Sequence, residues 1–123
     1  MSKQTIQMTD AQGNSLFPVS AECGNGWIRF ADGTQIVTGK ANVETSGEAT
    51  GAAYGFFGIG SVSFVKEFAQ GSEPVVITNV LENSAWWNSS AFDITAQGFK
   101  MSVGGDNKNI TREVCYIAIG RWK

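Results

Sequence analysis

The chain has 123 residues, which fits a single domain, and its formal net charge is −2. Its nine basic residues are scattered rather than gathered into the positive patch that nucleic-acid binding needs, so we expect no nucleic-acid partner. No apolar run approaches the roughly 20 residues that span a bilayer, and the polar start predicts neither membrane insertion nor a secretory signal peptide.

The first 24 residues differ in character from the rest of the chain. One short strand is expected at residues 5–8, and Pro18 restricts the segment around it to an edge or an extended conformation. We therefore interpret residues 1–24 as an N-terminal arm or fibre-attachment segment and residues 25–123 as one β-sandwich domain.

A β-hairpin is the clearest local pattern in the chain. Residues 27–30 favour a strand, and residues 34–38 favour its returning partner. Asp32 and Gly33 lie between them, and both residue types tolerate the positive φ of a tight two-residue turn.

Strand patterns recur through the remainder of the chain, whereas the best helix candidate, residues 65–70, is too short to be convincing. Further strands are expected at residues 61–64, 75–81, 92–95, 99–103 and 114–122. Within them Val62 and Phe64 should face inward, as should Phe99, Met101 and Val103. Roughly seven to nine short strands with regular turns predict an all-β, antiparallel β-sandwich or barrel.

The final strand, residues 114–122, is apolar on both faces. Such a strand lies centrally in its sheet, covered by a second sheet or by a partner subunit. Charged residues make up only 16% of the chain, below the roughly 25% of ordinary soluble domains, which also suits an oligomer.

Residues for catalysis or cofactor binding are scarce. The chain has no histidine, which removes the commonest general base and the commonest metal ligand. Cys23 and Cys115 match no metal spacing and are expected as thiols, with a disulfide as the alternative. The glycines of residues 55–60 lack the flanking strand and helix of a phosphate loop. We expect no enzyme, no metal and no cofactor, although a pair of carboxylates across a cleft would still suit a glycosidase.

The segment at residues 82–91 has the composition best suited to ligand binding. Its candidate ligand-binding residues are Trp86, Trp87, Asn83, Asn88 and Ser89. An exposed indole can stack on a sugar ring while neighbouring amides bond its hydroxyls. The alternative is that both tryptophans pack in the core or in a subunit contact.

Two further segments are weaker candidates for binding. One holds Asp106, Asn107 and Lys108, for which a solvated hairpin loop is the alternative. The other is the Gly- and Ala-rich loop that contains Tyr54.

Four segments in order resemble the C-terminal tip domains of bacteriophage (or prophage) tail fibres. They are the aromatic hairpin with its Asp-Gly turn at residues 25–36, the Val-Phe-Phe-Pro series within residues 61–78, the Gly-Phe turn at residues 96–99, and the Ile-Ala-Ile-Gly-Arg-Trp ending at residues 117–122. Together the matches span residues 25–122. The chain departs from the family in having only about 24 residues upstream and no His-x-His metal motif.

The resemblance implies an H-type-lectin-like β-sandwich, assembled as a homotrimer at the end of a tail fibre. It implies attachment to a bacterial surface glycan or protein, contact with other phage tail proteins, and a place in the virion tail after synthesis in the host cytoplasm. It carries over no binding residues, so the site candidates depend on loop chemistry alone. The alternatives are a structural or assembly protein of the tail and a stand-alone carbohydrate-binding lectin.

Overall fold

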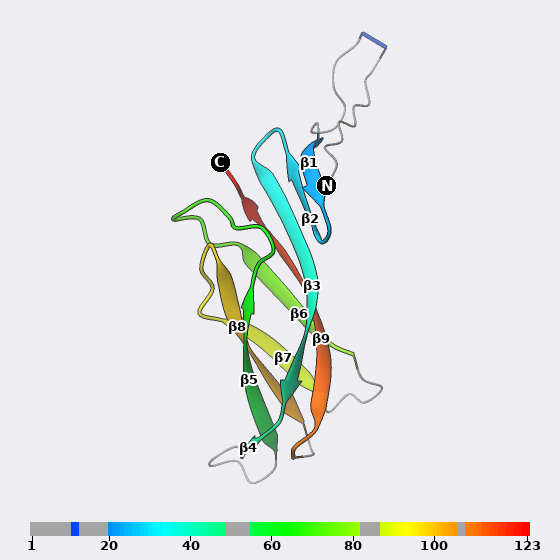
Figure 1. The fold of residues 1–123 in the computed structure, drawn as a ribbon, viewed down its shortest axis with the longest axis vertical. Helices are drawn as coiled ribbons and strands as arrows, with labels where there is room; N and C mark the ends of the chain where they lie inside the picture. Colours follow the sequence, from blue (N-terminus) through cyan, green and yellow to red (C-terminus); the bar gives the residue numbers. More distant parts are fainter. Residues whose placement is uncertain (1–10, 13–19, 49–54, 82–86, 106–107) are drawn as a thin grey trace.

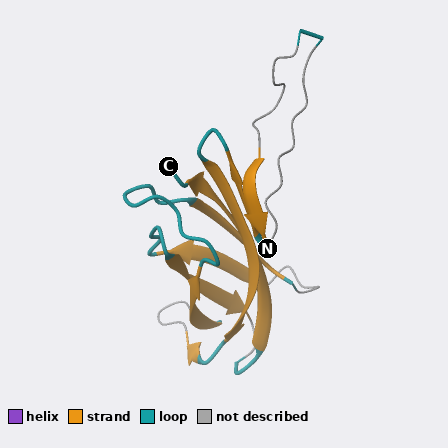
Figure 2. Cartoon of the chain, turned by 45° about the horizontal axis from the view of Figure 1, so that its top comes forward, coloured by secondary structure: helices purple, strands orange, loops and turns teal. Residues whose placement is uncertain are grey.

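Two antiparallel sheets packed face to face make up the fold (Figure 1). The computed structural model describes residues 11–12, 20–48, 55–81, 87–105 and 108–123. Within these residues every regular element is a strand, and no helix is long and apolar enough to cross a membrane. The prediction of an all-β antiparallel sandwich is confirmed (Figure 2).

The strands divide five and four between the two sheets. In spatial order, the larger sheet contains β1 (Ser20–Gly24), β2 (Trp27–Phe30), β3 (Thr34–Glu44), β9 (Thr111–Arg121) and β6 (Val75–Val80). The smaller contains β4 (Gly47–Glu48), β5 (Phe56–Ser63), β8 (Gly98–Gly105) and β7 (Asn88–Phe92). Residues 20–24 thus pair within the sandwich, while the expected strand at residues 5–8 lies outside the described residues.

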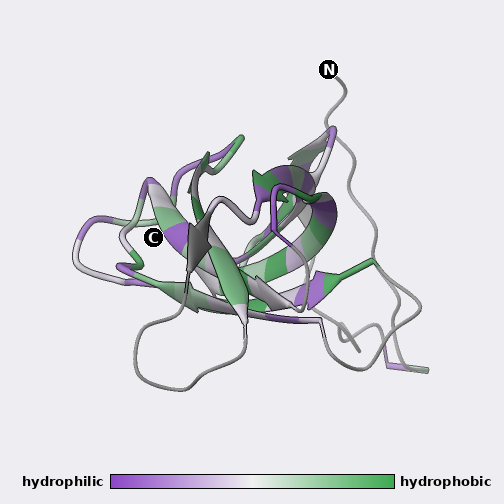
Figure 3. Ribbon diagram, turned by 90° about the horizontal axis from the view of Figure 1, so that it is seen from below, coloured by the Kyte–Doolittle hydropathy of each residue, from purple (hydrophilic) through white to green (hydrophobic). Residues whose placement is uncertain are grey.

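Alternation of buried and exposed side chains builds the core between the sheets, as the alternating hydropathy along the strands illustrates (Figure 3). Phe99, Met101 and Val103 on β8 are at most 3% exposed, which confirms their predicted inward orientation. Phe64 packs edge-on against Phe68, with ring centroids 5.1 Å apart, and both rings are buried. Burial of these large side chains is the main source of stability for such a sandwich.

Strand β9 lies at the centre of the larger sheet, as predicted. It pairs with β3 along its whole length and with β6 on its other side. Val114 and Ala118 on its inner face are fully buried, whereas Ile117 and Ile119 face outward from the sandwich. The second sheet therefore covers only one of its two apolar faces.

The predicted hairpin is confirmed, but its turn differs from the expected two-residue form. Ala31, Asp32 and Gly33 form a three-residue loop, in which only Gly33 has a positive φ, of 100°. The backbone N–H of Gly33 donates to the carbonyl of Phe30, the pattern of a type I turn followed by a left-handed glycine. This turn needs a positive φ only at Gly33. The side chain of Asp32 caps the turn by accepting a hydrogen bond from the backbone.

Replacement of Asp32 by Ala should lower the melting temperature at pH 7 by more than it does in acid. The backbone N–H of Thr34 donates to Asp32 Oδ1 at 2.9 Å, and this hydrogen bond lowers the pKa of the carboxyl. A carboxylate with a lowered pKa stabilises the fold above its unfolded pKa of about 3.9 and loses that contribution as the pH falls through the folded value. Thermal melts of both proteins between pH 7 and pH 2 should converge; a constant difference would contradict this role.

One predicted strand is wrong in its boundaries. The sequence predicts a strand at residues 92–95, but β7 ends at Phe92, and Asp93 adopts a φ of 49° that breaks the strand. Strand β7 instead uses the Asn- and Ser-rich stretch before it, because pairing with β8 and side-chain contacts override the weak strand propensity of these residues. Residues 65–70 are irregular, with the N–H of Phe68 bonded to the carbonyl of Ala96 rather than within a helix.

The two cysteines lie on β1 and β9, with β2 and β3 between them. Three strand spacings amount to about 14 Å, twice the separation of about 7 Å that a disulfide tolerates between Cα atoms. Cys23 and Cys115 therefore cannot be bonded to each other within one chain.

Candidate functional site

The described chain enters and leaves the sandwich at the same end (Figure 1). Ser20, the first residue of β1, pairs with Phe30, and the indole Nε1 of Trp122 donates to the carbonyl of Phe30 at 2.8 Å. From this end β3 runs for 11 residues, or about 33 Å, to the opposite end of the sandwich. We call these the hairpin end and the distal end.

At the distal end, the residues that flank the three predicted binding segments come together. Phe56, close to Tyr54 in the chain, pairs with Gly105, which directly precedes Asp106. The next residue of β8, Gly104, pairs with Asn88 on β7. The described residues that flank these segments, which are 18 to 52 residues apart in the chain as measured between Tyr54, Asn88 and Asp106, therefore meet at one end of the smaller sheet. The sequence alone did not predict this arrangement.

The predicted site residues have different positions. Tyr54, Asn83, Trp86, Asp106 and Asn107 lie outside the described residues. Asn88 and Lys108 are exposed, whereas Trp87 is buried and Ser89 is half-buried on the inner face of β7.

Trp87 is a core residue of the distal end. It is only 8% exposed, and its indole covers Gly105 so closely that a Cβ there would collide with the ring. The guanidinium of Arg112 lies 4.4 Å from the ring centroid on the other sheet, a cation–π contact. Of the two interpretations of this tryptophan, burial rather than ligand contact is the one that the structure supports.

Ser89 joins the two sheets. Its hydroxyl lies 2.8 Å from the hydroxyl of Thr78 on β6, so a hydrogen bond connects an edge strand of each sheet. A side chain used in this way is unavailable to a ligand. Of the 82–91 segment, Asn88 thus remains as the described polar candidate at the surface.

The outer face of the smaller sheet presents an aromatic ring beside Asn88. Phe57 is 38% exposed and faces outward, because its neighbour Gly58 faces the backbone of Glu44. Gly104 separates Phe57 from Asn88 in the strand register. The sequence analysis missed Phe57. Because side chains alternate along a strand, the inward orientation predicted for Val62 implies that residue 57 points outward.

Part of the outer face of the larger sheet is apolar. Two adjacent cross-strand rows form this part: Ile28, Ile36, Ile119 and Val75 make up one, and Ile117 and Ile77 lie in the next, beside Thr38. Val75, Ile77 and Ile119 are 67%, 59% and 41% exposed. We call these six side chains the apolar face. A contiguous exposed patch of this kind is typical of a surface that contacts another protein.

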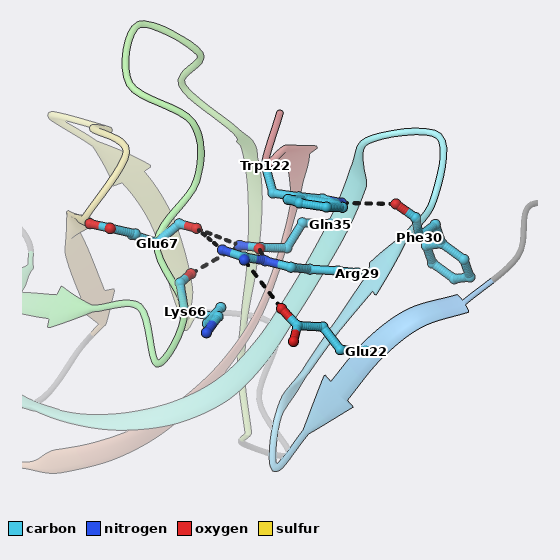
Figure 4. A network of polar contacts seen from close by, with 7 residues as sticks. All are labelled: Glu22, Arg29, Phe30, Gln35, Lys66, Glu67 and Trp122. Atoms are coloured by element: carbon cyan, nitrogen blue, oxygen red, sulfur yellow. Dashed lines mark hydrogen bonds and ion pairs between the residues drawn. The ribbon is translucent and has the colours of Figure 1, made fainter. Parts of the chain in front are cut away.

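The hairpin end holds a buried polar network (Figure 4). Gln35 is fully buried; its Oε1 accepts a hydrogen bond from Arg29 Nε at 2.6 Å, and its Nε2 donates to the carbonyls of Lys66 and Glu67. Arg29 also pairs with Glu22 at 3.3 Å and lies 5.0 Å from the Trp122 ring centroid.

This network uses residues from two of the four segments that resemble tail-fibre tips, namely the opening hairpin and Trp122 of the terminal segment. Its polar groups are engaged with one another and with the backbone, so it fastens the hairpin, the 64–74 loop and the C-terminal strand together. We assign it a structural role.

The described part of the chain contains no cluster of three or more His, Cys, Asp or Glu side chains that could hold a metal ion. Burial raises the pKa of the Tyr116 phenol, which packs in the core against Phe99 and stays protonated near neutral pH.

Comparisons with known proteins support the fold. No family model and no curated protein sequence matches the chain. The chain is similar in structure to a C-terminal fragment of the R1 pyocin fibre of P. aeruginosa, at 14% identity and a TM-score of 0.60 over 92% of this chain and 32% of that one. It is similar to an N-truncated R1-type pyocin tail fibre at 15% identity and a TM-score of 0.60, over 89% of each chain.

A third similar structure is the recombinant discoidin II of Dictyostelium discoideum, with 18% identity and a TM-score of 0.55 over 72% of this chain and 37% of that chain. The chain thus spans about a third of the length of discoidin II and of the longer pyocin fragment. At these identities the likeness shows the fold, which is that of a tail-fibre-like or lectin-like β-sandwich.

Proposed function

We propose that this domain is a non-catalytic attachment module at the tip of a phage or prophage tail fibre, and that it binds a bacterial surface glycan or protein. The observation that carries the proposal is that the two ends of the sandwich differ. The chain enters and leaves at the hairpin end, and the described residues that flank the three predicted binding segments meet at the distal end, about 33 Å away. A domain attached to a shaft at its hairpin end would present the distal end to the host. Its place would be the virion tail.

We further propose that three copies assemble through the apolar face. Side chains such as Val75 and Ile77 are too exposed to contribute much to the folding of one copy, and burying them against another copy would be favourable. Strand β6 forms the edge of the sheet beside this face and has no charged residue. Monomeric proteins usually protect such an edge with charged side chains. Three copies would hold a surface ligand far more tightly than one, because each later contact is intramolecular.

Binding to bacteria tests the proposal. Fluorescently labelled protein should bind intact cells of some strains in a panel, and the polysaccharide or surface protein extracted from those strains should compete for binding. The bound polysaccharide should keep its molecular mass during incubation, as measured by size-exclusion chromatography. Shortening of the polysaccharide would contradict a non-catalytic role, and failure to bind any strain would contradict attachment.

The apolar face also favours a second candidate, an assembly protein of the tail. In that case the face would contact another tail protein rather than further copies of this chain. The protein would then bind purified tail particles and not cells, and it would remain monomeric by itself.

A further inference from the structure

We infer that the outer face of the smaller sheet is a platform on which Phe57 stacks against an uncharged sugar residue, with Asn88 bonding the sugar's hydroxyls. This inference rests on the proposed attachment function and gives it a site and a ligand class. The two residues belong to one cross-strand row at the distal end, which reads Gly47, Phe57, Gly104 and Asn88 across β4, β5, β8 and β7.

The ring of Phe57 has no side-chain neighbour within its own row. Gly47 lies on one side of it and Gly104 on the other, so neither directly paired residue has a side chain that could cover the ring. The ring is 38% exposed on a strand whose inner face is fixed by close packing at Gly58. An exposed aromatic ring flanked by glycines can stack on the C–H face of a pyranose ring.

Polar groups lie near this ring: Asn88 is two strand spacings from Phe57 in the same row, or about 10 Å between the backbones. The side chain of Asn88 approaches Gly104, with its Oδ1 3.1 Å from where a Cβ of that glycine would lie. An amide offers a donor and an acceptor together, which suits adjacent hydroxyls of a sugar. In the next row the hydroxyls of Ser90 and Ser102 lie 3.0 Å apart and are exposed. The platform thus combines one stacking surface with several uncharged hydrogen-bonding groups.

The charges around the platform favour an uncharged sugar. None of the side chains in these two rows is ionisable. On β8 the next outward-facing residue is Lys100, whose ammonium pairs with Asp93 at 3.5 Å. Among the described side chains of these two rows, an acidic sugar would find no cation to pair with its carboxylate, whereas a neutral sugar would bring no charge that needs a partner.

The competing interpretation is that Phe57 only shields the backbone of the adjacent glycines, as aromatic residues across from glycine do in designed sheets. In that case its loss would lower stability and leave ligand binding unchanged. The two interpretations therefore separate when stability and binding are measured on the same variants.

The test uses immobilised bacterial O-polysaccharides, neutral and acidic, with apparent dissociation constants measured by biolayer interferometry in 0.15 M and 1 M NaCl. The variants are Phe57→Leu, Phe57→Tyr and Asn88→Ala, with Ser63→Ala as the control, since Ser63 is exposed on the same face of the same strand three rows away. We expect wild type to bind a neutral polysaccharide in both salt concentrations. Phe57→Leu and Asn88→Ala should each weaken binding about tenfold or more, while Phe57→Tyr and Ser63→Ala stay within about threefold of wild type.

Each other outcome is decisive. Unchanged binding by both Phe57→Leu and Asn88→Ala, or binding of acidic polysaccharides alone with loss in 1 M NaCl, would overturn the inference while attachment itself stood. Binding to no polysaccharide, together with binding to intact cells, would overturn the inference and favour a protein receptor; binding to neither would overturn the proposed function as well. If a thermal melt shows that Phe57→Leu is unfolded, Asn88→Ala decides by itself.

Discussion

Replacing Gln35 by Leu should lower the free energy of unfolding by about 2–4 kcal/mol. The substitution keeps the size of a fully buried side chain but removes three hydrogen bonds. It would leave the Nε of Arg29 and the carbonyls of Lys66 and Glu67 without this partner in a partly buried site. The desolvation of such groups is not recovered on folding, which is why a leucine of similar shape cannot substitute.

Gln97→Leu is the matched control for this change. Gln97 is exposed, and its amide bonds only the exposed side chain of Gln70, at 3.2 Å. The same substitution there should alter stability by less than about 0.5 kcal/mol. Chemical denaturation of both variants and wild type gives the comparison. Equal losses for the two variants would contradict the structural role assigned to the network at the hairpin end.

Replacing Ile77 by Asp should convert the proposed trimer into monomers without unfolding the chain. Ile77 is 59% exposed on the apolar face, so a charge there meets water in one isolated copy. In an assembly that buries this face, the same carboxylate would be enclosed by Ile117 and its neighbours with no cation to pair it. We expect the apparent dissociation constant of the oligomer to rise by at least about 100-fold, since an unpaired buried charge costs about 3–5 kcal/mol.

The control for this change is Ile59→Asp. Ile59 is 57% exposed on the outer face of the smaller sheet, so the two sites match in residue type and exposure. Sedimentation velocity at several concentrations should show a trimer for wild type and Ile59→Asp and a monomer for Ile77→Asp. A monomeric wild type, or dissociation by both variants alike, would contradict assembly through the apolar face.

The sequence predicted the fold well wherever one physical rule decided the outcome. Alternation placed Phe99, Met101 and Val103 in the core, and the two-sided apolar character of residues 114–122 predicted a central strand. It failed at β7, where Asn and Ser residues form a strand only because β8 and Thr78 supply partners that lie elsewhere in the chain.

The site was harder to predict from sequence because it depends on register between distant strands. Composition identified Trp87 as unusual, yet only the closeness of its indole to Gly105 and Arg112 shows that it is buried. Conversely, Phe57 looked like one apolar residue among glycines, and its exposure follows from the close approach of Gly58 to another strand. The residues that flank the three predicted binding segments likewise come together at the distal end only through pairings between strands far apart in the chain.

The most direct test of the account is to map the bound surface by nuclear magnetic resonance. Amide chemical shifts of the labelled protein would be compared with and without the polysaccharide that it binds most tightly. The account predicts that the shifts that change cluster at the distal end of the smaller sheet, around Phe57 and Asn88. Changes confined to the apolar face, or to the hairpin end around Arg29, would contradict it.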